Sequence, residues 1–258
     1  MKIRLLPAGS RVDGFNPEYG APTLPTVEIL REMMDEKDLW PINKKVWDYL
    51  DGNGFHLMTT LYTDLVNQYG ESLSIDEFAR NGQLLGAINS KSIWEVWNYN
   101  KLDYGDRFCS GLLFWYHNCS MRQVASRMWD WSLEPTASLY HTANSLEPLH
   151  AQFDYLKNTV SVVNDFYRDF NDYKVVAQVY DIDSRKVLEE SAIVNLPEDG
   201  VANDVLTIRF PENISQVHFI KLTLKDEKGK EVSSNFYWRS KDKYEGKTTL
   251  TGPATSGF

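Results

Sequence analysis

Hydrophobic positions follow helical spacing in the first half of the chain and strand-like alternation in the second. Apolar residues between 58 and 69 recur at intervals of three and four, which predicts a helix that stops at Gly70. The segment from Ser74 to Glu77 has the form of a capping box. It predicts a long helix that continues to about Val96.

Two segments of the first half are predicted to be strands. Residues 11–16 form a short one that leads into a sharp turn at Glu18. The apolar run from Cys109 to Tyr116 lacks helical spacing and follows a turn-like segment. We expect it to be a strand buried on both faces, as in parallel sheets. Shorter helices are expected over 26–34, where Pro25 suits a helix start, and over 135–144.

The second half predicts a β-sandwich. Short alternating runs are separated by turn residues such as Glu198-Asp199-Gly200. About seven strands at this spacing are typical of an immunoglobulin-like fold. The expected strands are 152–155, 159–163, 175–180, 187–194, 205–210, 217–224 and 232–238.

Composition narrows the possible functions. A content of 42% hydrophobic and 24% charged residues is that of a folded globular protein. The net charge of -9 would repel a phosphate backbone, so no nucleic-acid partner is expected. No apolar run is long enough for a membrane helix, so no membrane partner is expected. The five histidines have no metal spacing, no glycine-rich phosphate loop is present, and neither a metal nor another cofactor is expected. The thiols of Cys109 and Cys119 are expected to be buried and inert.

Glu18 is the candidate catalytic residue. A carboxylate held rigidly on a turn fits the nucleophile of a retaining glycosidase, which also needs a second carboxyl group. No convincing second carboxyl group is found in the sequence. A solvated loop carboxylate is the alternative interpretation of Glu18.

Several motifs, in order, resemble the C-terminal portion of glycoside hydrolase family 2. The resemblance is to the branch of exo-β-D-glucosaminidases and mannosylglycoprotein endo-β-mannosidases, and it spans nearly the whole chain. The motifs are Gly14–Glu18, Leu24–Met34 with Leu39–Pro41, Phe114–Asn118, Trp131–Pro135 with Glu147–His150, and Asn235–Trp238.

The resemblance implies the fold class. It assigns residues 1–148 to the C-terminal part of a (β/α)8 TIM barrel, including barrel strands seven and eight. Residues 149–240 would form the immunoglobulin-like β-sandwich, and residues 241–258 a linker or tail. Barrel strands one to six would be missing, so apolar surface should be exposed. We therefore expect the chain to associate with the remainder of the barrel or with itself.

The resemblance also implies site residues. Glu18 would be the nucleophile, at the C-terminal end of a barrel strand. Trp115 would form the floor of the sugar pocket, although a core tryptophan is an alternative. Asn118 would bind sugar hydroxyls or cap a turn. Trp40, which follows an acidic loop at 35–38, would line the rim of the site or anchor its own loop.

The family carries its general acid in an Asn-Glu pair, and this sequence contains no such dipeptide. The function expected is therefore that of a C-terminal fragment of a retaining β-glycosidase, with a carbohydrate partner and no activity in isolation. Glucosaminides and mannosides both stay open as substrates. The compartment also stays open: relatives are often exported to the periplasm or secreted, but the export signal of such a protein would lie upstream of this fragment. The alternative is a non-catalytic carbohydrate-binding or scaffolding module.

Overall fold

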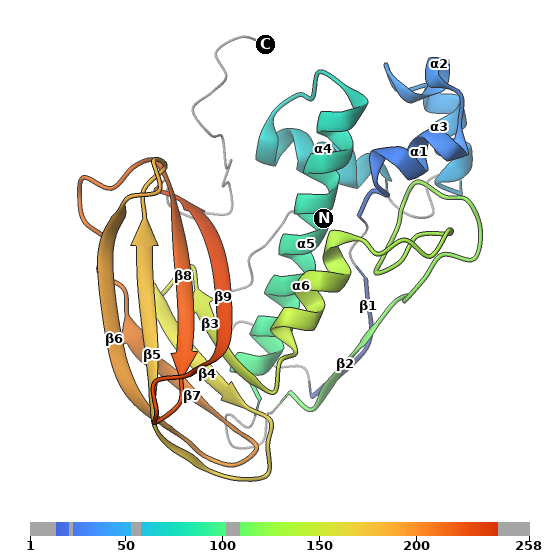
Figure 1. Cartoon of the computed structure of the whole chain (residues 1–258). Coiled ribbons are helices and arrows are strands. Elements are labelled where there is room, and N and C mark those ends of the chain that lie inside the picture. The colour runs from blue at the N-terminus through green and yellow to red at the C-terminus, as the bar shows by residue number, and fades with distance from the viewer. Residues whose placement is uncertain (1–13, 21–22, 53–57, 102–108, 242–258) are drawn as a thin grey trace.

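The computed structural model describes residues 14–20, 23–52, 58–101 and 109–241. Within these ranges, a small parallel strand pair and a group of helices precede an antiparallel sandwich, and the long helix α5 lies between the strand pair and the sandwich (Figure 1). No helix in the described ranges is long and apolar enough to span a membrane. The elements before the sandwich are β1 (Phe15–Tyr19), α1 (Val27–Met33), α2 (Glu36–Leu39), α3 (Lys44–Leu50), α4 (Met58–Tyr69), α5 (Ile75–Tyr99), β2 (Gly111–Phe114) and α6 (Ala137–Ser145).

The predicted long helices are confirmed, and their ends have the expected caps. The Ser74 hydroxyl oxygen accepts a hydrogen bond from the Glu77 backbone N–H at 3.2 Å, and the Glu77 carboxylate accepts one from the Leu73 N–H at 2.8 Å. Helix α4 ends before Gly70, whose φ of 80° is a conformation that favours glycine. The helix expected over 135–144 is present as α6.

Helices α2 and α3 were not predicted. The acidic segment 35–38 was expected to be a loop, but most of it lies in the short helix α2. The Asn43 side chain accepts a hydrogen bond from the Lys45 N–H at 3.2 Å and thereby starts α3. These helices are too short to show the periodicity on which the sequence argument depends.

Strands β1 and β2 pair in parallel. Phe15 pairs with Gly111, Asn16 with Leu112, and Tyr19 with Phe114. Between these last two pairs, β1 has two residues and β2 has only Leu113. Strand β1 therefore carries a bulge. A strand was predicted over residues 11–16, whereas β1 spans Phe15–Tyr19 and so begins and ends later in the chain. Residues 1–13 are outside the described ranges.

The sandwich has the seven strands that were predicted. They are β3 (Leu149–Asp154), β4 (Thr159–Asn164), β5 (Phe170–Tyr180), β6 (Lys186–Leu196), β7 (Gly200–Thr207), β8 (Val217–Lys225) and β9 (Glu231–Ser240). The order is β3-β4-β7 in one sheet and β6-β5-β8-β9 in the other, and every pairing is antiparallel. Strand β7 starts earlier than expected, because Asp199 takes a positive φ of 45° and turns the chain directly into it.

Alternating residues of both sheets fill the sandwich core. Val160, Val162, Val175, Ile220 and Leu222 have no exposed surface. They belong to one continuous apolar cluster. Burial of this apolar area is the main favourable contribution to the stability of the sandwich.

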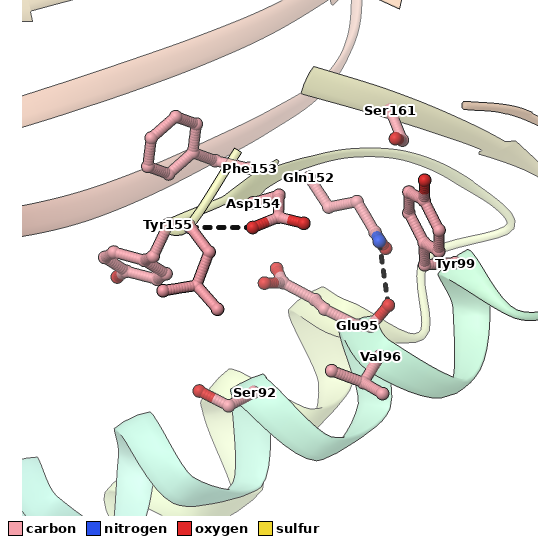
Figure 2. A pocket seen from close by; sticks show the side chains of 10 residues that line it. Ser92, Glu95, Val96, Tyr99, Gln152, Phe153, Asp154, Tyr155 and Ser161 are labelled. Carbon is pink, nitrogen blue, oxygen red and sulfur yellow. Dashed lines mark hydrogen bonds between the residues drawn. The ribbon is translucent and has the colours of Figure 1, made fainter. Parts of the chain in front are cut away.

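Helix α5 contacts the sandwich through buried polar groups. Gln152 on β3 donates a hydrogen bond from its amide to the Glu95 backbone carbonyl at 2.7 Å. Figure 2 shows Glu95 on the helix turned toward the segment that carries Gln152 and Asp154, beside a cavity of about 30 Å³. Both Glu95 and Gln152 are buried, so the helix and the sandwich are held by paired polar groups as well as by apolar contact.

Candidate active site

The two faces of the β1–β2 pair have different surroundings. On one face, Leu112 is buried in a cluster with Ile93 and Trp97 of α5, and Tyr19 packs against the same cluster. The Trp97 indole N–H donates to the Gly111 carbonyl at 3.2 Å. This face is therefore covered by helix α5.

The opposite face is exposed and apolar. Phe15 is 52% exposed, Leu113 55% and Trp115 49%. A strand buried on both faces was predicted for this run, and that prediction is wrong for the described chain, since only one face has a cover. The alternation of a strand explains the result, because Leu112 points to α5 and Leu113 points away from it.

Strand alternation assigns Glu18 to the same exposed face, because the next residue, Tyr19, packs toward α5. The bulge places Pro17 and Glu18 together opposite Leu113, and all three residues are exposed. The Glu18 backbone N–H donates to the Asn16 side-chain oxygen at 3.0 Å, which fixes the backbone just before the carboxylate. Trp115 follows Phe114, the strand partner of Tyr19, so it comes from the adjacent strand end.

A glycine allows the two strand ends to approach closely. A Cβ atom at Gly20 would lie 1.9 Å from the Trp115 carbonyl oxygen, so no larger residue fits there without a backbone shift. The Trp115 N–H donates to the Tyr19 carbonyl, which extends the ladder past the end of β2. The carboxylate of Glu18 and the indole of Trp115 are therefore carried by a tightly joined pair of strand ends.

Sequence reasoning missed a layer of residues behind these strand ends. The guanidinium of Arg127 lies 5.0 Å from the centre of the Tyr116 ring, and the Tyr116 hydroxyl accepts a hydrogen bond from Gln123 at 2.6 Å. Arg127 is buried, and desolvation lowers its pKa. Its Nε has no hydrogen-bond partner among the described residues and lies 3.6 Å from the Cβ position of Gly20. Arg127 belongs to no motif in the sequence, so its position beside Tyr116 and Gly20 could not be predicted.

Asn118 and Trp40 are less closely tied to this face. Asn118 is exposed in the loop after β2, where its backbone bridges to Trp129. Trp40 is half-buried with its ring 5.7 Å from that of Phe78. It lines a cavity of about 580 Å³ that Trp47 and Tyr62 also line. Glu18, Trp115 and Asn118 are not among the residues that line this cavity, so the structure does not bring Trp40 together with them.

Comparisons with known proteins agree with the motifs. The domain family described as Mannosidase Ig/CBM-like domain matches residues 157–244. The chain is 26% identical over 234 residues to the exo-β-D-glucosaminidase of Streptomyces avermitilis. This alignment covers 88% of this chain and 26% of the relative. It is 22% identical over 244 residues to the enzyme of the same name from Hypocrea jecorina, with 88% and 26% covered.

The chain is a relative of glycoside hydrolase family 2. It spans about a quarter of the length of the curated relatives that it matches. The predicted relationship to this family is thereby confirmed.

Solved structures show the same fold. The exo-chitosanase CsxA of Amycolatopsis orientalis, in complex with PNP-β-D-glucosamine, superposes with a TM-score of 0.78 at 24% identity, over 91% of this chain and 28% of that one. The β-D-mannosidase from Dictyoglomus thermophilum gives 0.68 at 15% identity, over 86% and 27%. The immunoglobulin-like sandwich predicted for the second half is confirmed. The domain boundaries at 148 and 240 and the site residues stay predictions.

Proposed function

We propose that this chain supplies the nucleophile, Glu18, of a retaining β-glycosidase that hydrolyses β-linked glucosaminides or mannosides. The observation that supports this most strongly is the exposed face of the β1–β2 pair, which carries Glu18 and Trp115 at adjacent ends of parallel strands. Active sites of (β/α)8 barrels are built at this end of the strands.

The two faces of the strand pair fit a place in a barrel wall. In such a barrel, helices cover the outside of each strand and side chains of neighbouring strands fill the inside. The face that packs on α5 corresponds to the outside, and the face with Phe15, Leu113 and Trp115 corresponds to the inside. We infer that β1 and β2 are barrel strands seven and eight, and that the remaining strands come from sequence outside this chain.

The chemistry follows from a carboxylate at this position. A Glu18 oxygen attacks the anomeric carbon, the bond from that carbon to the leaving oxygen breaks, and a glycosyl ester forms. A second carboxyl group about 5–5.5 Å away protonates the leaving oxygen and then activates the water that hydrolyses the ester. Because the sequence has no Asn-Glu pair, we assign that acid to the part of the barrel outside this chain.

Neighbouring residues would orient the sugar and the nucleophile. The exposed indole of Trp115 offers a flat apolar surface to the C–H face of a pyranose. Gly20 and Arg127 would hold the two strand ends at a fixed distance. Asn118, exposed in the loop after β2, would bind sugar hydroxyls. Trp40 lines a separate cavity and would contact the substrate only farther from the reacting carbon.

A chimeric enzyme tests this proposal. The matching segment of the Amycolatopsis orientalis enzyme is replaced by this chain, and hydrolysis of 4-nitrophenyl β-D-glucosaminide and β-D-mannoside is measured. We expect an active chimera, a loss of at least about a thousandfold in kcat for Glu18→Gln, and full activity for the control Glu28→Gln on the exposed side of α1. A folded, active chimera whose Glu18→Gln variant keeps its activity would overturn the proposal.

A further inference from the structure

The outer face of the four-stranded sheet carries a row of aromatic side chains. Tyr180, Phe219 and Trp238 are directly paired across β5, β8 and β9. Their neighbours Val179, Ile220 and Tyr237 are buried in the core, so the three aromatic residues face outward. Phe236, 48% exposed, stacks on Phe219 with ring centres 5.7 Å apart and planes inclined by 21°. These aromatic rings therefore lie on the outer face of the sandwich and not in its core.

A cavity of about 380 Å³ opens where this aromatic row meets helix α6. Tyr140, His141 and Asn144 line it from the helix, and Lys221, Phe236 and Trp238 line it from the sheet. The His141 ring meets Trp238 edge-on, with centres 6.4 Å apart. Aromatic walls with a few polar groups are the usual composition of a small-molecule site.

Among the described residues, the cavity carries one positive charge that has no ion-pair partner. Lys221 is exposed, and no carboxylate forms an ion pair with it in the described part of the chain. Neither aspartate nor glutamate is among the lining residues. Lys91 also lines the cavity, but its ammonium group is held by Asn235 and by the Phe236 carbonyl at 2.8 Å, and Glu95 lies close enough to offset its charge. Across the sheet Lys221 pairs with Gln178, which pairs with Glu189, and the carboxylate of Glu189 is held by Lys186 at 2.6 Å.

We propose that this cavity binds a carboxylate-bearing pyranose, that is, a uronic acid residue of an acidic glycan. The rings of Phe236 and Trp238 suit the C–H face of the sugar, and Lys221 pairs with its carboxylate. The Asn144 amide nitrogen donates to the Ser234 carbonyl at 3.1 Å, so its side-chain oxygen is the group that can accept from a sugar hydroxyl. His141 can bond a second hydroxyl; burial lowers its pKa to about 4, so its ring is neutral at pH 7. A cationic glucosamine unit would be repelled by Lys221. The site thus differs in charge preference from the proposed catalytic site, and it does not depend on Glu18.

The test is a titration of the whole chain followed by NMR through the indole N–H of Trp238, assigned by its loss in Trp238→Phe. The probes are a tetrasaccharide of alternating glucuronate and N-acetylglucosamine, the neutral N-acetylglucosamine tetramer, and the cationic glucosamine tetramer. We expect saturable binding of the acidic probe, at least about fivefold weaker binding of the neutral one, and weakening of the acidic complex at 0.5 M salt.

Variants separate this site from the surrounding surface. Lys221→Gln should weaken the acidic complex about fivefold, and Phe236→Ala about tenfold. Lys174→Gln, an equal charge change on an exposed residue of β5 outside the cavity, should leave the affinity unchanged. Glu18→Gln should also bind normally, so a failed glycosidase test would leave this result intact. No saturable binding of the acidic probe, equal affinity for the neutral probe, or an unchanged affinity in Lys221→Gln would each overturn the proposal.

Discussion

The hydroxyl group of Tyr237 on β9 donates a hydrogen bond to a carboxylate oxygen of Glu95 on α5 at 2.7 Å, inside the junction between helix and sandwich. The same oxygen accepts from the Asn235 amide at 3.0 Å and lies 3.2 Å from Nε2 of His150. All four side chains are buried. The coordination of one buried carboxylate by three sandwich residues ties the sandwich to the helix that also covers β2.

Removing the Tyr237 hydroxyl should weaken this junction. In Tyr237→Phe, the Glu95 oxygen loses one donor while it stays buried, and we expect the free energy of unfolding to fall by about 1–3 kcal/mol. Urea unfolding followed by fluorescence measures the change. Tyr167→Phe serves as the control, because Tyr167 is 85% exposed. A loss below about 0.5 kcal/mol in Tyr237→Phe would show that the hydrogen bond does not stabilise the junction.

The ammonium group of Lys91 should matter more, because it is the buried counter-charge of Glu95. Its Nζ lies 3.8 Å from the centre of the Tyr237 ring, and its approach is one cause of the lowered Glu95 pKa. We expect Lys91→Met to cost about 3–5 kcal/mol, since a buried carboxylate then lacks a compensating charge. Adding Glu95→Gln to this variant should recover part of the loss. If the double variant is less stable than Lys91→Met, the pairing is not the cause.

Acid sensitivity should depend partly on His218. Its ring is buried with its centre 5.1 Å from that of Phe210, and desolvation is the main reason that its pKa falls to about 4, with Arg239 and Lys241 adding to the effect. Between about pH 4 and pH 6.5 the unfolded chain binds this proton and the folded chain does not, so stability decreases as the pH falls through that range.

Other groups also make stability depend on pH in this range. His141, with a pKa lowered to about 4, changes the stability in the same direction as His218, and Asp51, with a pKa raised to about 6, changes it in the opposite direction. Replacement of His218 alone isolates its contribution. We expect the stability of His218→Phe to fall less steeply between pH 6.5 and pH 4.5 than that of the wild type, by up to about 1.4 kcal/mol per pH unit. Urea unfolding at several pH values measures this slope. Parallel curves for the two proteins would exclude His218 as an acid-sensitive group.

The exposed face of β1 and β2 should make the isolated chain associate. Phe15, Leu113 and Trp115 form apolar surface that the remainder of a barrel would cover. We expect multi-angle light scattering to show concentration-dependent oligomers, and Phe15→Ser/Leu113→Glu to shift the chain to a monomer. Ile193→Glu, on an exposed apolar residue of β6, is the matched control and should leave the oligomers in place. A wild-type monomer at all concentrations would contradict this expectation.

Periodicity predicted most of the fold. The helices at 58–69 and 75–99 and the seven sandwich strands have repeats or turn residues that can be recognised in sequence. The short helices around 36–39 and 44–50 have too few turns to show a period. The prediction that residues 109–116 are buried on both faces was wrong. An apolar run shows that burial of a strand would be favourable, but whether both faces are buried depends on which other segments pack against them.

The sequence predicted candidate residues for the site but not how they are arranged in space. Glu18 and Trp115 stand out through motifs, and their adjacency depends on a parallel pairing between segments almost a hundred residues apart. The roles of Gly20 and Arg127 depend on distances between backbone and side chain that no spacing encodes. The hydrogen bonds of Glu95 with His150, Asn235 and Tyr237 could not be predicted for the same reason, since these residues come from α5, β3 and β9.

Chemical rescue of the chimeric enzyme that carries Glu18→Ala tests whether Glu18 is the nucleophile. With a 4-nitrophenyl β-glycoside, removal of the nucleophile should stop hydrolysis, and azide should enter the vacated space and attack the anomeric carbon in place of the carboxylate. We expect restored release of 4-nitrophenol and a glycosyl azide of the α configuration, identified by NMR. Activity of Glu18→Ala without azide, or no α-glycosyl azide with it, would contradict the assignment of Glu18 as the nucleophile.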